Sequence, residues 1–203
     1  IAGRSESLPE AERIRSANAE INARIEHMER THRADIRQYR GKDRVLLETS
    51  FLFEFFHRFL ERFDHFIRQQ VRSPDRSLKV PFVREAFFYL QGRGFEEDSV
   101  RRYFELVFQL RRAYFFIDRG LVGRSAAMQD LRRQLWNNVF TRDLDLYNRH
   151  LWDRMEDFST LLLGETGTGK GTAAAAIGRS GFIPFDPRSG RFVESFPRCF
   201  VSL

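Results

Sequence analysis

The chain of 203 residues has one cysteine, Cys199, and no long apolar run. A single cysteine cannot form a disulfide within the chain, and there is no cluster of thiols for a metal. No stretch approaches the roughly 20 apolar residues that a helix needs to span a membrane. The first residues also lack the basic and then apolar pattern of a signal peptide. We therefore expect a soluble, cytoplasmic protein in a reducing compartment.

Charge of one sign is not concentrated in any segment. The chain has 34 Lys and Arg against 28 Asp and Glu, which gives a net charge of +6. Over residues 1–45, ten basic and eight acidic residues are thoroughly mixed, as on solvated helices. A basic balance also suits a nucleic acid or another anionic partner, but no run of like charges favours one here. Internal repeats and low-complexity segments are absent from the sequence as well.

Residues 1–44 are predicted to form a long connector or coiled-coil-like helix, running from about 8 to 40. Ser7-Leu8-Pro9-Glu10 fits a capping box at its start. A seven-residue spacing, that of a short coiled-coil seam, joins Ile14, Ile21 and Met28. The companion positions are small or polar, so an exposed connector helix stays open as the alternative to a helix that pairs.

Residues 45–118 are rich in phenylalanine, with 15 of the chain's 22 between positions 51 and 116. A spacing of four, which puts side chains on one helix face, links Phe51, Phe55, Phe59 and Phe63. We predict that this helix breaks at Ser73-Pro74-Asp75 and that two more follow, over 82–91 and from about 98 to 116. The stripe predicts a helical core rather than a surface that stacks bases. A regulatory role is one interpretation of this module.

Nearer the C-terminus, the order strand, glycine-rich loop, helix is predicted. Residues 158–163 are a short apolar stretch typical of a strand, and the alanine-rich residues 172–177 indicate a helix. The segment between them fits the pattern G-x-x-x-x-G-K of a phosphate-binding loop. The binding residues predicted there are Gly164, Glu165, Thr166, Gly167, Thr168, Gly169, Lys170, Gly171 and Thr172.

Each residue type in this loop has a physical role. Glycines permit unusual dihedrals and a close approach, so that backbone N–H groups point at a phosphate. Lys170 would reach the β- and γ-phosphates, and the N-terminus of the next helix adds partial positive charge. The usual pattern has Ser or Thr directly after the lysine to ligate Mg²⁺. Here Gly171 takes that place, and Thr172 is only a weak candidate. The alternative is a glycine-rich turn that binds nothing.

Gly164-Glu165-Thr166-Gly167-Thr168-Gly169-Lys170 resembles the phosphate loop of bacterial sigma-54-dependent transcriptional activators, which are AAA+ ATPases. That family usually reads G-E-[ST]-G-T-G-K-E and also lacks Ser or Thr after the lysine. Leu121-Val122-Gly123-Arg124-Ser125-Ala126-Ala127-Met128-Gln129 resembles the family's opening segment. By that resemblance, Val122 and Gly123 would lie against the adenine. Ser125 is also predicted to cap a helix over 126–140.

The resemblance covers about residues 120–203, with segments 141–157 and 181–198 read as insertions. It implies a mainly α N-terminal region followed by the start of an α/β P-loop NTPase (AAA+) domain at residues 119–203. The cofactors implied are ATP and Mg²⁺. The partner implied is the RNA polymerase sigma-54 holoenzyme, remodelled by a homo-oligomeric ring, with DNA bound through a C-terminal domain that is not present here.

No acidic Walker B strand is identifiable, so no catalytic residue is assigned. We expect the chain to bind nucleotide without turning it over. Because it begins without Met and stops in a strand-like run at 199–203, we expect the rest of the ATPase to lie beyond residue 203. Two alternatives stay open: another AAA+ or P-loop NTPase unrelated to transcription, and a helical adaptor module with a degenerate nucleotide fold.

Overall fold

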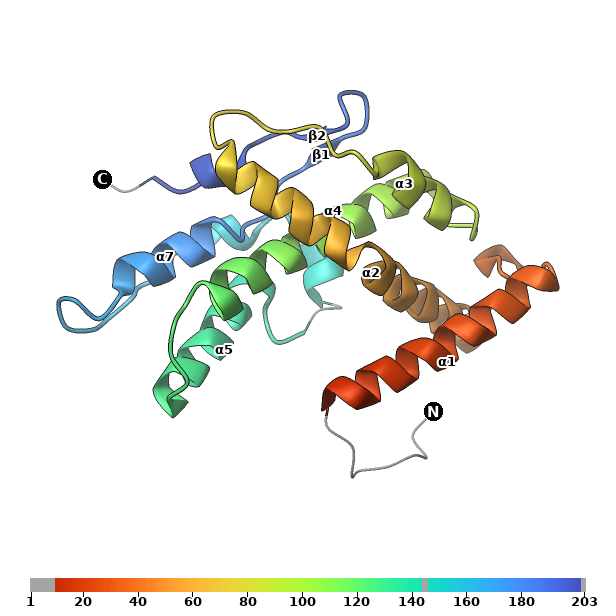
Figure 1. Cartoon of the computed structure of the whole chain (residues 1–203), viewed down its shortest axis with the longest axis horizontal. Helices are drawn as coiled ribbons and strands as arrows, with labels where there is room; N and C mark the ends of the chain where they lie inside the picture. Colours follow the sequence, from red (N-terminus) through yellow and green to blue (C-terminus); the bar gives the residue numbers. More distant parts are fainter. Residues whose placement is uncertain (1–9, 144–145, 202–203) are drawn as a thin grey trace. The chain divides into compact units, whose positions relative to one another are not determined.

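Helices dominate the chain, as the periodic apolar faces predict. The structure is a computed structural model that describes residues 10–143 and 146–201 (Figure 1). Contacts divide the chain into two compact units, which are described separately. The first comprises Ile1–Leu60 and Arg84–Val100, and the second comprises Glu61–Val83 and Arg101–Leu203. The three-part organisation drawn from the sequence stays a prediction.

The described residues of the first unit are mainly helical and also include the first turn of α4 (Glu97–Ala113), up to Val100. Their other elements are α1 (Glu10–Arg30), the N-terminal part of α2 (Gly41–Arg72), and α3 (Val83–Gln91), with a 3-10 turn, η1, at Ile36–Gln38. Helix α1 ends at Arg30 rather than near residue 40. The Thr31 hydroxyl donates to the carbonyl of His27 at 3.0 Å, and His32 takes a left-handed φ of 54°, which ends the helix. The predicted capping box begins at Ser7, outside the described residues.

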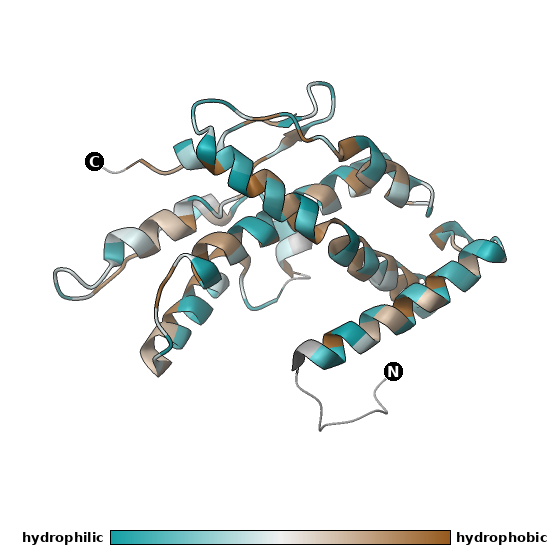
Figure 2. Ribbon diagram, in the orientation of Figure 1, coloured by the Kyte–Doolittle hydropathy of each residue, from teal (hydrophilic) through white to brown (hydrophobic). Residues whose placement is uncertain are grey.

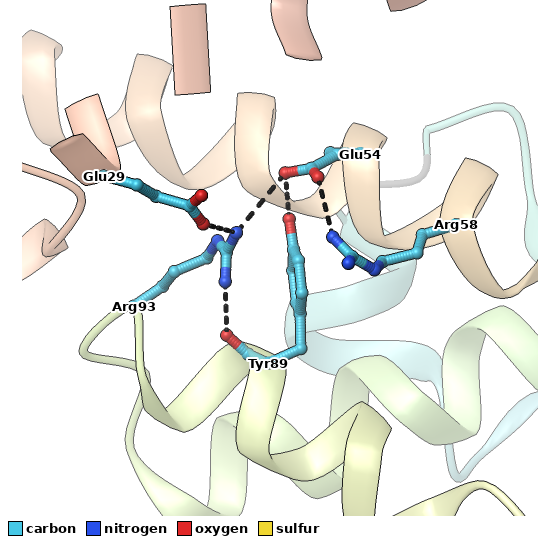
Figure 3. A network of polar contacts seen from close by, with 5 residues as sticks. All are labelled: Glu29, Glu54, Arg58, Tyr89 and Arg93. Atoms are coloured by element: carbon cyan, nitrogen blue, oxygen red, sulfur yellow. Dashed lines mark hydrogen bonds and ion pairs between the residues drawn. The ribbon is translucent and has the colours of Figure 1, made fainter. Parts of the chain in front are cut away.

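A partly buried network of polar contacts connects Glu29, Glu54, Arg58, Tyr89 and Arg93 in the first unit (Figure 3). Arg93, which is 8% exposed, donates to Glu29 at 2.5 Å and to the Tyr89 carbonyl at 3.0 Å, and lies 3.7 Å from Glu54. Glu54 also accepts from the Tyr89 hydroxyl and from Arg58. Burial raises the pKa of Tyr89, so its hydroxyl stays a donor. The network joins α1, α2 and α3.

The second unit contains the rest of α2, α4 from Arg101 onward and the elements that follow it. The elements after α4 are the π-helical turn η2 (Tyr114–Arg119), α5 (Ala126–Phe140), η3 (Tyr147–Leu151), η4 (Met155–Asp157), α7 (Lys170–Gly178), β1 (Phe185–Asp186), β2 (Arg191–Phe192) and η5 (Phe196–Arg198). Bands of apolar and polar residues alternate along α2 and α4 (Figure 2), as in helices that bury one face.

Phenylalanine side chains form the core of the second unit around a small hairpin. Strands β1 and β2 pair antiparallel, with Phe185 opposite Phe192. The Phe192 ring stacks on Phe108 of α4 with centroids 3.8 Å apart, and it lies parallel to Phe104. Phe63 of α2 packs against the same helix. The prediction that the phenylalanine stripe is core is confirmed, since Phe51, Phe55, Phe59 and Phe63 are all fully buried.

The prediction of an α/β P-loop (AAA+) domain is wrong. The described residues form a mainly helical structure whose sheet is the two-stranded antiparallel hairpin, without a parallel sheet. Residues 158–163, predicted as a strand, have no strand partner in the described part of the chain, and Leu161 and Leu163 are 81% and 83% exposed. A strand inside a parallel sheet is buried on both faces. None of the helices within the described ranges has the length and apolar character needed to cross a membrane.

Candidate phosphate-binding site

The glycine-rich loop precedes α7 and keeps the backbone that its sequence predicts (Figure 1). Gly167 and Gly169 have φ angles of 84° and 87°, a region that residues with a Cβ atom adopt only at a cost. A Cβ atom added at either position would meet nothing within 4 Å. Backbone conformation, rather than lack of space, therefore makes glycine the suitable residue at both positions.

Lys170 is the first residue of α7, and its side chain folds back across the loop. The ammonium donates to the carbonyl oxygens of Gly164 at 2.8 Å and Glu165 at 2.7 Å. The Thr168 hydroxyl donates to the same Glu165 carbonyl at 2.8 Å. These bonds close the loop on itself. The positively charged ammonium of Lys170 is therefore held beside the N-terminus of α7.

The first turn of α7 supplies donors at this position. Its first intrahelical bond runs from the Ala173 N–H to the Gly169 carbonyl at 3.0 Å. The N–H groups of Lys170, Gly171 and Thr172 precede that bond and have no acceptor within the helix. Gly169 is the N-cap residue and provides no side-chain cap. Backbone donors and the helix dipole therefore favour an anion at this end of α7.

The other residues predicted for the loop are exposed: Glu165, Thr166, Thr168, Gly171 and Thr172. Exposure suits residues that would contact a ligand arriving from solvent. Within the described residues, no group of three or more His, Cys, Asp or Glu side chains is arranged to hold a metal ion.

Val122 and Gly123, which are predicted to lie against an adenine, are in the segment just before α5. Val122 is 87% exposed. The carbonyl of Gly123 accepts from Arg132 at 2.8 Å, and the Leu121 carbonyl accepts from the same nitrogen. Ser125 caps α5 as predicted, by accepting from the Met128 N–H. No hydrogen bond between described residues joins Val122 or Gly123 to the loop, so their role stays a prediction.

The C-terminal end of α7 is anchored by buried polar residues of α4 that the sequence did not reveal. Arg112, which is 1% exposed, donates to the carbonyls of Arg179 at 3.0 Å and Gly181 at 2.6 Å. Gln109 donates to the Ser180 carbonyl and accepts from the Tyr147 hydroxyl. Burial raises the pKa of Tyr147 to about 12. The signal available in the sequence was a pair of polar residues, Gln109 and Arg112, three positions apart on an apolar helix face.

The site as a whole is a glycine-rich loop and helix N-terminus carried by a helical framework. No protein family, curated protein or solved structure matches this chain.

Proposed function

We propose that the loop from Gly164 to Thr172 binds the phosphate groups of a nucleotide, and that the nucleotide is ATP. The observation that supports this most is the position of Lys170, whose ammonium contacts the Gly164 and Glu165 carbonyls beside the free N–H groups of α7. Carbonyl dipoles leave the positive charge uncompensated. Phosphate oxygens carry a formal charge and form stronger hydrogen bonds with an ammonium, so they would replace the carbonyls as its partners.

The proposal concerns the loop and its helix. Because the described residues form no parallel sheet, phosphate binding is proposed here for a loop on a helical framework, not for an AAA+ domain. Mg²⁺ would accompany the nucleotide by binding its phosphate oxygens. The Thr172 hydroxyl is exposed and makes no hydrogen bond to a described residue, so it is the protein ligand that we propose for the metal.

A wider role in transcription rests on the resemblance of residues 121–129 and 164–170 to sigma-54-dependent activators. We propose that the full-length protein regulates transcription by acting on the sigma-54 holoenzyme with the energy of ATP hydrolysis, as a homo-oligomeric ring that binds DNA through a further domain. The cytoplasm is the location that we propose for it.

Calorimetric titration of the chain with ATP and Mg²⁺ tests the loop proposal directly. We expect Lys170→Ala to weaken ATP binding by roughly 10- to 100-fold, the effect of losing hydrogen bonds to a charged group. Lys42→Ala is the matched control, because Lys42 is an exposed lysine of α2 in the first unit and should leave the affinity unchanged.

Equal affinity of wild type and Lys170→Ala would contradict the proposal. If neither protein binds ATP, the glycine-rich turn binds no nucleotide, and the mainly helical structure favours an adaptor module instead. Steady turnover of ATP that depends on Lys170 would show that the chain carries catalytic residues that its sequence does not reveal.

A further inference from the structure

An open cleft of about 550 Å³ at the C-terminal end of α2, in the second unit, is lined by several cationic residues. The cleft is lined by Gln69, Arg72, Ser73, Arg76, Leu78, Lys79, Pro81 and Arg191. Half of these residues are cationic, and none of the described residues that line the cleft is acidic. The cleft therefore concentrates positive charge in a concave surface, which raises the local potential for an anion.

The four cations have no carboxylate partner within the described ranges. Arg72, Arg76 and Lys79 are exposed, and the Arg191 guanidinium donates to the carbonyl of Ser77. Arg111 in the same unit shows the usual alternative, since it forms a bidentate pair with Asp64 at 2.8 Å for both bonds. The cleft thus collects like charges whose mutual repulsion a bound anion would relieve.

The backbone that carries these cations is fixed by a buried amide. Gln70, which is 2% exposed, donates to the carbonyls of Ser73 and Arg76 and accepts from the Leu78 N–H, each at 2.8 Å. The buried Ser195 hydroxyl donates to the Pro74 carbonyl at 2.8 Å. Residues 73–78 are therefore held in one conformation, so Arg76 within this segment, and Arg72 and Lys79 beside it, need little ordering of their backbone when a ligand binds.

The size and chemistry of the cleft define its ligand. Its volume lies within the roughly 300–1,000 Å³ typical of small-molecule sites, and arginine forks match phosphate oxygens. None of its described lining residues is aromatic, whereas sites for single-stranded nucleic acid stack bases on aromatic rings. We propose that this cleft binds an oligophosphate, a small molecule with two or more linked phosphate groups. This inference is independent of the loop before α7.

Titration with inorganic triphosphate tests this proposal, and a Lys170→Ala background removes the loop as a competing site. We expect one molecule of triphosphate to bind per chain in that background. Adding Arg76→Gln and Lys79→Gln together should weaken binding by roughly 100-fold, because two charged contacts are lost. The salt dependence of the dissociation constant should become shallower as well. Arg68→Gln with Arg188→Gln is the matched control, since it removes two exposed arginines outside the cleft.

Each other outcome would overturn the proposal. Triphosphate binding that disappears with Lys170→Ala alone would place the phosphate only at the loop. Equal losses in the cleft and control variants would indicate a diffuse effect of net charge. Binding of a single-stranded oligonucleotide, but not triphosphate, through Arg76 and Lys79 would identify a nucleic-acid site. Arg72→Gln is a second variant, because Arg72 lies at the end of α2 rather than in the segment after it. Thermal melts of these cleft variants should match those of the parent, because the substituted side chains are exposed.

Discussion

Arg93 in the first unit and Lys170 in the second are both cations that donate to backbone carbonyls, yet their environments differ. Arg93 is buried, contacts the carboxylates of Glu29 and Glu54, and lies 3.5 Å from the centre of the Tyr89 ring. Lys170 contacts carbonyl oxygens. Arg93 is buried and paired with carboxylates, so its charge is used within the fold, whereas the less buried Lys170 has carbonyl partners that we propose a phosphate replaces. Burial and carboxylate partners, rather than carbonyl contacts, distinguish the two cations.

Replacing Arg93 should have the largest effect on stability. Arg93→Met would leave the buried Glu54 with a hydroxyl and one exposed arginine as partners, and would remove the contact over Tyr89. Breaking a buried ion pair typically costs about 3–5 kcal/mol, and we expect a loss near 3 kcal/mol in urea unfolding. Arg84→Met, at an exposed position of α3, should change the free energy of unfolding little. An equally small effect of both substitutions would contradict the structural role that we assign to Arg93.

A glycine substitution in the phosphate loop should have an intermediate effect. Gly169→Ala places a side chain at a φ of 87°, which costs about 1–2 kcal/mol in the left-handed region. Because the loop is exposed, we expect it to rearrange and lose ATP affinity by roughly tenfold, with little change in the melting temperature. Gly41→Ala is the control, since Gly41 also has a positive φ, 56°, with open space around it, but lies at the start of α2 outside the loop. A larger loss of affinity for the control would place the critical backbone elsewhere.

The smallest effect concerns Glu105, a buried carboxylate of the second unit that accepts from the Phe185 N–H at 2.8 Å. Burial is the main cause that raises its pKa. The folded state therefore binds the proton more tightly than the unfolded state, and stability falls as pH rises from the usual glutamate pKa to the raised one. Glu105→Gln keeps the acceptor and should remove this slope, with a gain under about 1 kcal/mol at neutral pH. Urea unfolding between pH 4 and pH 8 measures it, and an unchanged slope would contradict the assignment.

Local patterns predicted most of the helices, apart from the end of α1, but not the sheet. The Ser125 cap and the four-residue spacing from Phe51 to Phe63 are properties of neighbouring residues, and the structure confirms both. The strand predicted at 158–163 needed partner strands, which no local pattern encodes. Its apolar residues are exposed instead, and the sheet that does form uses Phe185 and Phe192, which pack on α4.

The candidate sites also differ in whether residues adjacent in the sequence could predict them. The loop was predicted because its glycines and Lys170 are contiguous, and Gly167 and Gly169 have the left-handed backbone that such loops use. The cationic cleft and the Arg112 anchor bring together residues distant in the sequence, so they became visible only with the fold. Val122 and Gly123 were selected by a family resemblance, and their contact with adenine stays a prediction.

The anchoring of α7 at its C-terminal end has a mechanical consequence. Nine helical residues span roughly 13 Å, and Arg112 holds the carbonyls of Arg179 and Gly181 directly after this helix, at the end opposite the proposed phosphate site. If a bound phosphate pulled α7 along its axis, either the Arg112 hydrogen bonds would lengthen or α4 would move with α7. A shift of α7 caused by a bound phosphate would then be transmitted to α4 and to the phenylalanine side chains that pack on it.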